Sequence, residues 1–236
     1  MLSLVIPTYN EQVNLEALIQ RIGRSMGEIP YEVIVVDDDS PDGTGELAER
    51  LACRYPLRVL HRKGRRGLGT AVVEGLREAR GEILGFMDAD LSHPPESLPS
   101  LLEPIRDGTA EIAVGSRSVE GGGASDDWSR RRRLLSRFAK LLARPLTAVR
   151  DSTSGFFLFR RAVIEGVRLT PRGYKIGLEI LVKGRYRAVR EVPIFFEERQ
   201  GGKTKMSLGV SLDYLLHLGA LFAHQRRPGL RFDPED

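Results

Sequence analysis

Short apolar runs alternate with helical periodicities along the first half of the chain. Five apolar runs predict strands, at residues 2–7, 32–36, 57–61, 83–87 and 112–115. Between them, apolar residues recur every three or four positions, which is typical of amphipathic helices. These helical stretches cover residues 15–26, 47–51, 67–79 and 98–105. Strands and helices that alternate with short connections favour an α/β fold, in which a mostly parallel sheet is flanked by helices.

The second half of the chain follows a different pattern. A glycine-rich loop at 120–128 precedes a basic amphipathic helix predicted over 129–149 and broken at Pro145. The remaining pattern predicts a strand, a short helix, another strand and a final helix, at 154–159, 177–183, 187–196 and 207–223. No stretch is long and uncharged enough to cross a bilayer, so the amphipathic helices are expected to meet a membrane only at its surface.

Composition sets wider bounds. The 236 residues are 41% hydrophobic and 29% charged, which is typical of one large domain with a sizeable core. The single cysteine, Cys53, lies in a helical pattern, is expected to be a small core residue, and indicates a reducing, cytoplasmic compartment. The chain starts with an apolar strand and no basic leader, so no signal peptide is expected. Clusters at Arg130–Arg133 and Arg226–Arg227 suit phosphates, or simply a solvated surface.

Polar or acidic residues follow three of the predicted strands. Asp88 and Asp90 follow one strand, Asp37–Asp39 another, and Thr8–Glu11 the first. The carboxyl ends of parallel strands meet at one edge of a sheet, where ligands bind. Two acids separated by one residue in an extended segment project to the same side and suit a divalent cation. Three consecutive acids repel one another, so a cation or a donor-rich ligand is expected to neutralise Asp37–Asp39.

Seven segments together resemble the family-2 glycosyltransferases of the GT-A fold, and within them the dolichol-phosphate mannose synthase group. They are Val5–Glu11, Val36–Thr44, Met87–Glu96, Gly115–Arg117, Thr153–Phe156, Tyr174–Glu179 and Arg199–Lys205. The resemblance covers nearly the whole chain and implies one Rossmann-like GT-A domain over residues 1–224. Its nucleotide-sugar-binding part would be 1–117 and its acceptor-binding part 118–224, followed by a tail at 225–236.

The resemblance also implies a role for each matching residue. The nucleotide-sugar pocket would contain Pro7, Tyr9, Glu11, Asp37, Asp39, Asp88, Ala89 and Asp90. The metal, Mg²⁺ or Mn²⁺, would lie at Asp88, Asp90 and Ser92, the last replacing a glutamine that is usual in the group. The acceptor phosphate would be held by Arg117, Arg131, Ser154, Lys175, Arg199 and Lys205. Asp90 and Arg117 are the expected catalytic residues, and His93 is expected to be structural.

The implied reaction is inverting transfer of a hexose, mannose from GDP-mannose, to a dolichyl or polyprenyl phosphate. That acceptor is already an anion, so catalysis would rest on positioning and charge stabilisation rather than on a general base. UDP-glucose or another nucleotide sugar is an alternative donor, and a non-catalytic nucleotide-binding module is an alternative of another class. Nucleic acid is not an expected partner, because the basic clusters lack interleaved aromatic residues. The protein is expected to be cytoplasmic, with its helices on the inner face of the membrane.

Overall fold

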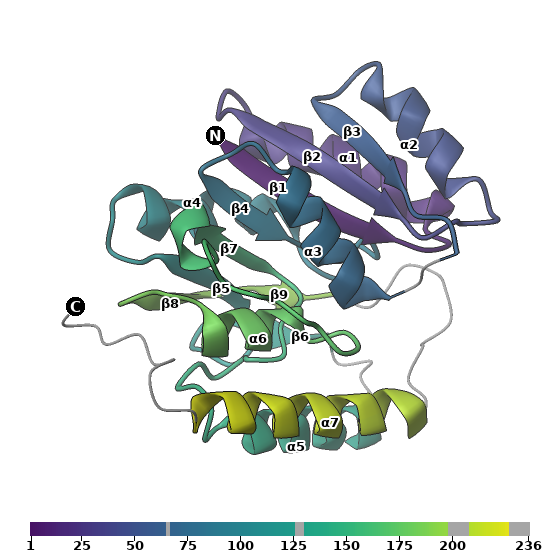
Figure 1. The fold of residues 1–236 in the computed structure, drawn as a ribbon. Coiled ribbons are helices and arrows are strands. Elements are labelled where there is room, and N and C mark those ends of the chain that lie inside the picture. Colours follow the sequence, from purple (N-terminus) through teal and green to yellow (C-terminus); the bar gives the residue numbers. More distant parts are fainter. Residues whose placement is uncertain (65–66, 126–129, 198–207, 227–236) are drawn as a thin grey trace.

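The computed structural model describes residues 1–64, 67–125, 130–197 and 208–226. They form a twisted sheet with helices on both faces and two further helices below it (Figure 1). The strands are β1 (Leu2–Thr8), β2 (Tyr31–Asp37), β3 (Leu57–His61), β4 (Ile83–Phe86), β5 (Ile112–Ser116), β6 (Gly123–Ala124), β7 (Phe157–Arg160), β8 (Val189–Pro193) and β9 (Phe195–Phe196). The helices are α1 (Gln12–Met26), α2 (Thr44–Ala52), α3 (Leu68–Glu78), η1 (Pro95–Ser97), α4 (Leu98–Arg106), α5 (Arg130–Ala143), η2 (Arg161–Val163), α6 (Ile176–Lys183) and α7 (Leu208–Gln225).

Among the described residues, seven strands make up the main sheet, in the order β3-β2-β1-β4-β7-β5-β8. All neighbouring pairs are parallel except those of β7, which runs antiparallel to β4 and β5. The expected α/β fold with a mostly parallel sheet is therefore confirmed. Because β7 runs in the opposite direction, its first residues lie beside the last residues of β4, with Phe86 opposite Phe157.

Both faces of the sheet are covered, which explains why its strands are continuous apolar runs. Successive side chains of β1 point to opposite faces. Leu4 and Ile6 pack in the core that contains α1, α2 and α4. Val5 packs in the second core, which contains α3 and α6. Within β1 the buried Ser3 donates its hydroxyl to Glu32 (2.6 Å), and the polar residues that lead into the loop begin at Thr8, at the carboxyl end of the strand.

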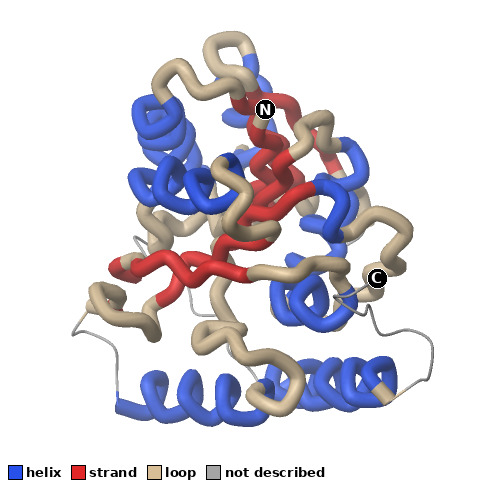
Figure 2. The backbone as a smooth tube through the Cα atoms, turned by 90° about the vertical axis from the view of Figure 1, so that its left-hand side faces the viewer, coloured by secondary structure: helices blue, strands red, loops and turns tan. Residues whose placement is uncertain are grey.

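The pair α5 and α7 lies side by side at one end of the molecule (Figures 1 and 2). Their shared core consists of Ala143, Leu146, Leu178, Leu218 and Leu221, of which Leu178 belongs to α6. The Tyr214 hydroxyl of α7 donates a hydrogen bond to the Ala139 carbonyl of α5, 2.7 Å away. Within the described ranges, no helix has the length and apolar character needed to cross a membrane.

Three sequence expectations need correction. The run 187–196 forms two strands rather than one, and the second, β9, pairs with β6 in a separate two-stranded sheet. The strand expected over 154–159 begins only at Phe157, because the preceding residues form a loop at the sheet edge. Cys53 is exposed rather than part of the core. It follows the last residue of α2 and so lies beyond the buried stripe of that helix.

Candidate active site

The carboxyl ends of β1, β2, β4 and β5 meet the beginning of β7 at one edge of the sheet. In the β1–β2 register Thr8 lies opposite Asp37, so the first two polar strand ends are neighbours. The loop before β7 joins them from the other side. Its Gly155 lies so close to Asp88 that an added Cβ would be 2.6 Å from the Asp88 carboxylate oxygen Oδ2. The residues expected at one edge from the parallel strand order are therefore brought together.

Asp37 and Asp38 are both buried, and the chain itself supplies their partners. Asp37 accepts hydrogen bonds from the Thr8 hydroxyl (2.9 Å), the Ser40 backbone N–H (3.0 Å) and the Ser40 hydroxyl (2.6 Å). Asp38 forms an ion pair with Arg62 (2.9 Å) and accepts a hydrogen bond from the Gly67 N–H (2.8 Å). The expectation that a bound cation or ligand neutralises all three acids is thus wrong for Asp38.

Arg62 is a buried cation that none of the sequence motifs predicts. It follows β3, and its N–H donates to the Asp37 carbonyl at the end of β2. Its guanidinium also contacts Glu74 (3.2 Å) and donates to the Thr70 hydroxyl (2.8 Å), both on α3. The sequence does contain one indication of this pair: Arg62 directly follows a predicted strand, and the neighbouring strand ends in acids. Burial raises the pKa of Asp38, whereas the charge of Arg62 lowers it. The Asp38 carboxylate therefore depends on Arg62 as its counter-charge.

The nucleotide-sugar residues predicted from the resemblance occupy this edge in different ways. Tyr9 and Glu11 follow β1, and the buried Glu11 accepts a hydrogen bond from the Asn14 side chain (2.9 Å). Pro7 lies opposite Val36 within the sheet. Asp39 is exposed and has a positive φ of 56°, a conformation that a short polar side chain tolerates better than most. Their contacts with a nucleotide remain predictions.

Asp88 and Asp90 follow β4, with the buried Ala89 between them. Asp90 accepts hydrogen bonds from the Ser92 N–H (3.1 Å) and from the Ser92 hydroxyl. Leu91 has a positive φ of 61°, so the chain turns sharply directly after Asp90. Ser92 is buried, and its hydroxyl in this structure orients Asp90. Its role as a metal ligand remains a prediction.

His93 is buried under this acidic pair. Its ring lies between Phe156 and Phe196, with centroid distances of 5.7 and 5.0 Å. Its Nδ1 is 3.8 Å from Asp88 Oδ2. Burial lowers the pKa of His93 to about 4, so the imidazole is neutral at pH 7 and does not cancel the charge of the carboxylates.

The donor chemistry of this segment fits a divalent cation. Asp88 and Asp90 supply hard carboxylate oxygens, and the neighbouring imidazole is neutral. Within the described part of the chain, no group of three His, Cys, Asp or Glu residues is arranged to hold a metal. Mg²⁺ and Mn²⁺ sites of this kind take their remaining ligands from phosphate oxygens and water.

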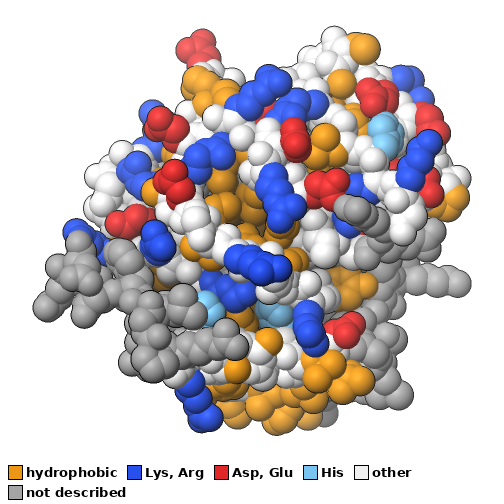
Figure 3. Space-filling model, in the orientation of Figure 1, with side chains coloured by type: hydrophobic (Ala, Val, Ile, Leu, Met, Phe, Trp, Pro, Cys, Tyr) orange, Lys and Arg blue, Asp and Glu red, His pale blue; other side chains and the backbone are white. Residues whose placement is uncertain are grey.

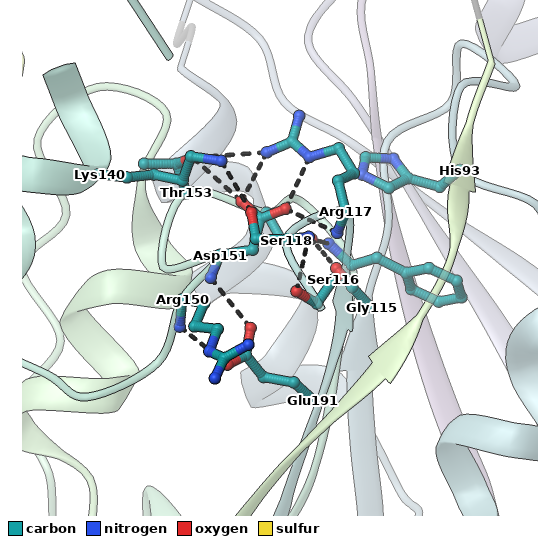
Figure 4. A network of polar contacts seen from close by, with 12 residues as sticks. His93, Gly115, Ser116, Arg117, Ser118, Lys140, Arg150, Asp151, Thr153 and Glu191 are labelled. Atoms are coloured by element: carbon teal, nitrogen blue, oxygen red, sulfur yellow. Dashed lines mark hydrogen bonds and ion pairs between the residues drawn. The ribbon is translucent and has the colours of Figure 1, made fainter. Parts of the chain in front are cut away.

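Arg117, at the end of β5, is held by a buried carboxylate (Figure 4). Its Nε and Nη2 donate to the two oxygens of Asp151, each at 2.7 Å, and its guanidinium lies 5.0 Å from the Phe196 ring centroid. Although burial opposes ionisation of Asp151, the hydrogen bonds and charge of Arg117 hold the pKa of this carboxyl at about 2. The motifs do not predict this role for Asp151. Its one signal in the sequence is its position two residues before the Thr153–Phe156 segment.

Of the other residues predicted to bind the acceptor phosphate, the structure describes Lys175 and Ser154. Lys175 donates to the Thr153 carbonyl (2.8 Å), and burial lowers the pKa of its ammonium group. The Ser154 hydroxyl donates to the Gly115 carbonyl (2.7 Å), so here it connects the loop to β5. The side chain of Arg131 and all of Arg199 and Lys205 lie outside the described residues.

Known proteins resemble the chain in sequence and in fold. Residues 3–168 match the model of glycosyl transferase family 2. The chain is 45% identical over 220 residues to a dolichol-phosphate mannosyltransferase of Pyrococcus furiosus, covering 92% of this chain and 62% of that protein. It is 38% identical over 232 residues to the dolichol-phosphate mannosyltransferase of Saccharomyces cerevisiae, covering 93% of this chain and 86% of that protein.

A solved structure shares the fold. It is the mannosyltransferase PcManGT of Pyrobaculum calidifontis in complex with GDP-Man and Mn²⁺, with a TM-score of 0.65 and 24% identity. The match covers 99% of this chain and 66% of that one. Together with the strand order, this similarity confirms the expected GT-A fold.

We expect Gly155→Ala to weaken Mn²⁺ binding about tenfold, because the new Cβ would force the Asp88 carboxylate to move. Isothermal titration calorimetry with Mn²⁺ measures the change. Gly219→Ala is a matched control, since its Cβ would meet no atom within 4 Å. Equal affinities for the two variants would show that Asp88 does not bind the ion.

The Asp151 pKa predicts how stability depends on pH. A carboxyl whose folded pKa is about 2, below its ordinary 3.8, stabilises the protein above pH 4, and this contribution disappears as the pH falls towards 2. Its size is ~2 kcal/mol. Urea unfolding should therefore show Asp151→Asn to be less stable than wild type at pH 6, with a smaller difference at pH 2.5. Asp213→Asn, at an exposed position on α7, should show no such trend. A pH-independent difference for Asp151→Asn would contradict the assignment.

Proposed function

Because the chain belongs to glycosyl transferase family 2, we propose that it transfers mannose from GDP-mannose to the phosphate of a polyprenol or dolichol. The observation that carries this proposal is the placement of an acidic pair and a cationic pair at one sheet edge. Lys175 interacts electrostatically with both Asp88 and Arg117, and His93 with Asp90, Arg117 and Lys175. The activity named for the two curated relatives, which match more than nine tenths of this chain, supports the proposal.

On the donor side, Asp88 and Asp90 would hold a Mg²⁺ or Mn²⁺ ion. Such an ion supplies charge neutralisation for the departing nucleoside diphosphate. Asp90 is oriented for this role by Ser92, and Gly155 leaves room beside Asp88. Pro7, Tyr9, Glu11, Asp37, Asp39 and Ala89 are proposed to line the pocket for the nucleotide sugar.

On the acceptor side, Arg117 and Lys175 would bind the phosphate of the lipid. An oxygen of this phosphate forms the new bond to the anomeric carbon, and the bond from that carbon to the diphosphate breaks. No proton has to be removed, because the phosphate is already an anion. This scheme needs no general base, and the neutral, buried His93 is not required as one. Displacement from the opposite side inverts the anomeric centre, and catalysis rests on positioning and charge.

The lipid acceptor also gives a use to an apolar surface. Leu134, Leu135, Phe138 and Leu141 of α5 are exposed, with Leu134 at 68%. Leu212, Leu215 and Leu216 of α7 are exposed as well, with Leu212 at 59%. Figure 3 shows hydrophobic side chains gathered along the lower edge of the molecule, where Figure 1 places the two helices. Each helix packs one face on the domain and exposes another, and we propose that the exposed faces lie in the cytoplasmic surface of the membrane.

Asp90→Ala should reduce transfer from GDP-mannose by about 10²-fold or more, because the departing diphosphate loses its counter-charge. The assay follows mass-detected transfer to a short polyprenyl phosphate with Mg²⁺ or Mn²⁺, from a panel that includes GDP-mannose and UDP-glucose. Asp107→Ala, an exposed acid after α4, is the matched control and should retain full activity. Full activity of Asp90→Ala would reject the site, and transfer from UDP-glucose alone would reject the proposed donor.

Replacing Leu212, Leu215 and Leu216 together with serine should lower binding to anionic vesicles by about tenfold or more, since each exposed leucine contributes apolar area. Co-sedimentation with phosphatidylglycerol vesicles measures this. The control is Val13→Ser, which removes a 78% exposed apolar side chain from α1. If the wild-type protein does not sediment with the vesicles, the membrane surface is assigned wrongly.

A further inference from the structure

A partly buried polar network surrounds Arg117, with the buried Asp151 at its centre (Figure 4). Asp151 accepts two hydrogen bonds from the Arg117 side chain and a third from its backbone N–H, 2.9 Å away. The carboxylate is fully buried. Because one carboxylate binds both the backbone and the guanidinium of the same arginine, it fixes the direction of the guanidinium relative to β5.

Asp151 is itself fixed from the opposite side. The backbone N–H groups of Arg150 and Asp151 donate to the two carboxylate oxygens of Glu191, at 2.8 and 3.0 Å. Glu191 belongs to β8 and lies opposite Val114 of β5. The turn that carries Asp151 is therefore tied to the same strands that carry Arg117.

Lys140 brings α5 into this network. Its Nζ donates to the hydroxyl of Ser118, 2.8 Å away, and Ser118 directly follows Arg117. The charges of Asp151 and Arg117 both act on the Lys140 ammonium group. On the same helix, Phe138 and Leu141 are exposed to solvent. The Lys140–Ser118 hydrogen bond thus joins α5, which carries the exposed apolar residues, to the residue next to Arg117.

We propose that Asp151 and Lys140 are positioning residues that set the Arg117 guanidinium for the acceptor phosphate and link its placement to α5. The inference rests on the proposed function, since it assigns Arg117 to that phosphate. Neither residue has to touch the substrate. Lipid contact on α5 and phosphate contact at Arg117 then become connected through Lys140 and Ser118.

Positioning and simple electrostatics predict opposite results for Asp151→Asn. Removing a negative charge beside an anion-binding arginine would, by electrostatics alone, strengthen phosphate binding and lower KM. Loss of positioning instead raises KM for polyprenyl phosphate, by about tenfold, because the guanidinium is no longer held in one orientation. The affinity for GDP-mannose, measured by calorimetry, should change less than about twofold in both cases.

Two further variants separate charge from geometry. Ser118→Ala keeps every charge and removes only the acceptor of the Lys140 hydrogen bond. Positioning therefore predicts a raised KM, whereas electrostatics predicts an unchanged KM. Lys140→Gln should raise KM as well, and Lys140→Arg should bring KM back most of the way to the wild-type value. Glu32→Gln is the control for damage to a buried ion pair, because Glu32 pairs with Arg58 (3.0 Å) at the amino-terminal edge of the sheet. It should lower stability and leave KM unchanged.

A measurement without turnover keeps the inference distinct from the proposed function. The ¹H–¹⁵N signal of Arg117 Nε, assigned by its loss in Arg117→Lys, should be protected from exchange in the wild type and exchange faster in Lys140→Gln and Ser118→Ala. If wild type transfers no sugar from any donor, the proposed function fails, and this signal alone decides the positioning. An unchanged signal, or a lowered KM in Asp151→Asn, overturns the inference.

Discussion

Burial of β1 on both faces is the constraint on which the rest of the molecule depends. The strand lies inside the sheet between β2 and β4, and its alternate side chains fill two separate cores. A shift by one residue would exchange those side chains between cores of different shape and move Thr8 away from its place opposite Asp37. The register therefore fixes where the polar strand ends begin. It places Thr8 beside Asp37, and through the β1–β4 register it fixes how far along the sheet Asp88 and Asp90 follow β4.

Charge at this edge is balanced locally and unevenly. Arg62 neutralises Asp38, and Arg117 binds Asp151 through two hydrogen bonds. Removing one partner of such a buried pair is costly, because the other charge is then left buried without its counter-charge. The neutral His93 beneath Asp88 and the neutral donors of Ser92 at Asp90 leave the negative charge of that segment in place. An acidic segment facing Arg117 and Lys175 suits a reaction between two phosphate-bearing substrates, as in the proposed function.

The helices α5 and α7 link this edge to an apolar surface. Their shared core attaches them to α6, and Lys140 of α5 reaches the residue next to Arg117. In the proposed function, the lipid tail and its phosphate would thus meet neighbouring parts of one structure. The short paired strands β6 and β9 belong to the same region, and Phe196 of β9 packs on both His93 and Arg117.

Local sequence patterns predict the parts of this protein in which burial repeats along an element. Apolar runs and helical periodicity located the five strands of the first half, and the parallel order that follows from them brought Asp37–Asp39 and Asp88–Asp90 to one edge. The motifs supplied a family and a role for Arg117 and Lys175. The pairing of charges, by contrast, is visible only in the folded molecule. Arg62 binds Asp38, Asp151 binds Arg117 across 34 residues, Gly155 packs against Asp88, and Cys53 faces solvent. Periodicity records which face of an element is buried, because burial repeats along a helix or strand. Pairing between side chains distant in sequence depends on register and on loop paths, which leave no repeating trace in the chain.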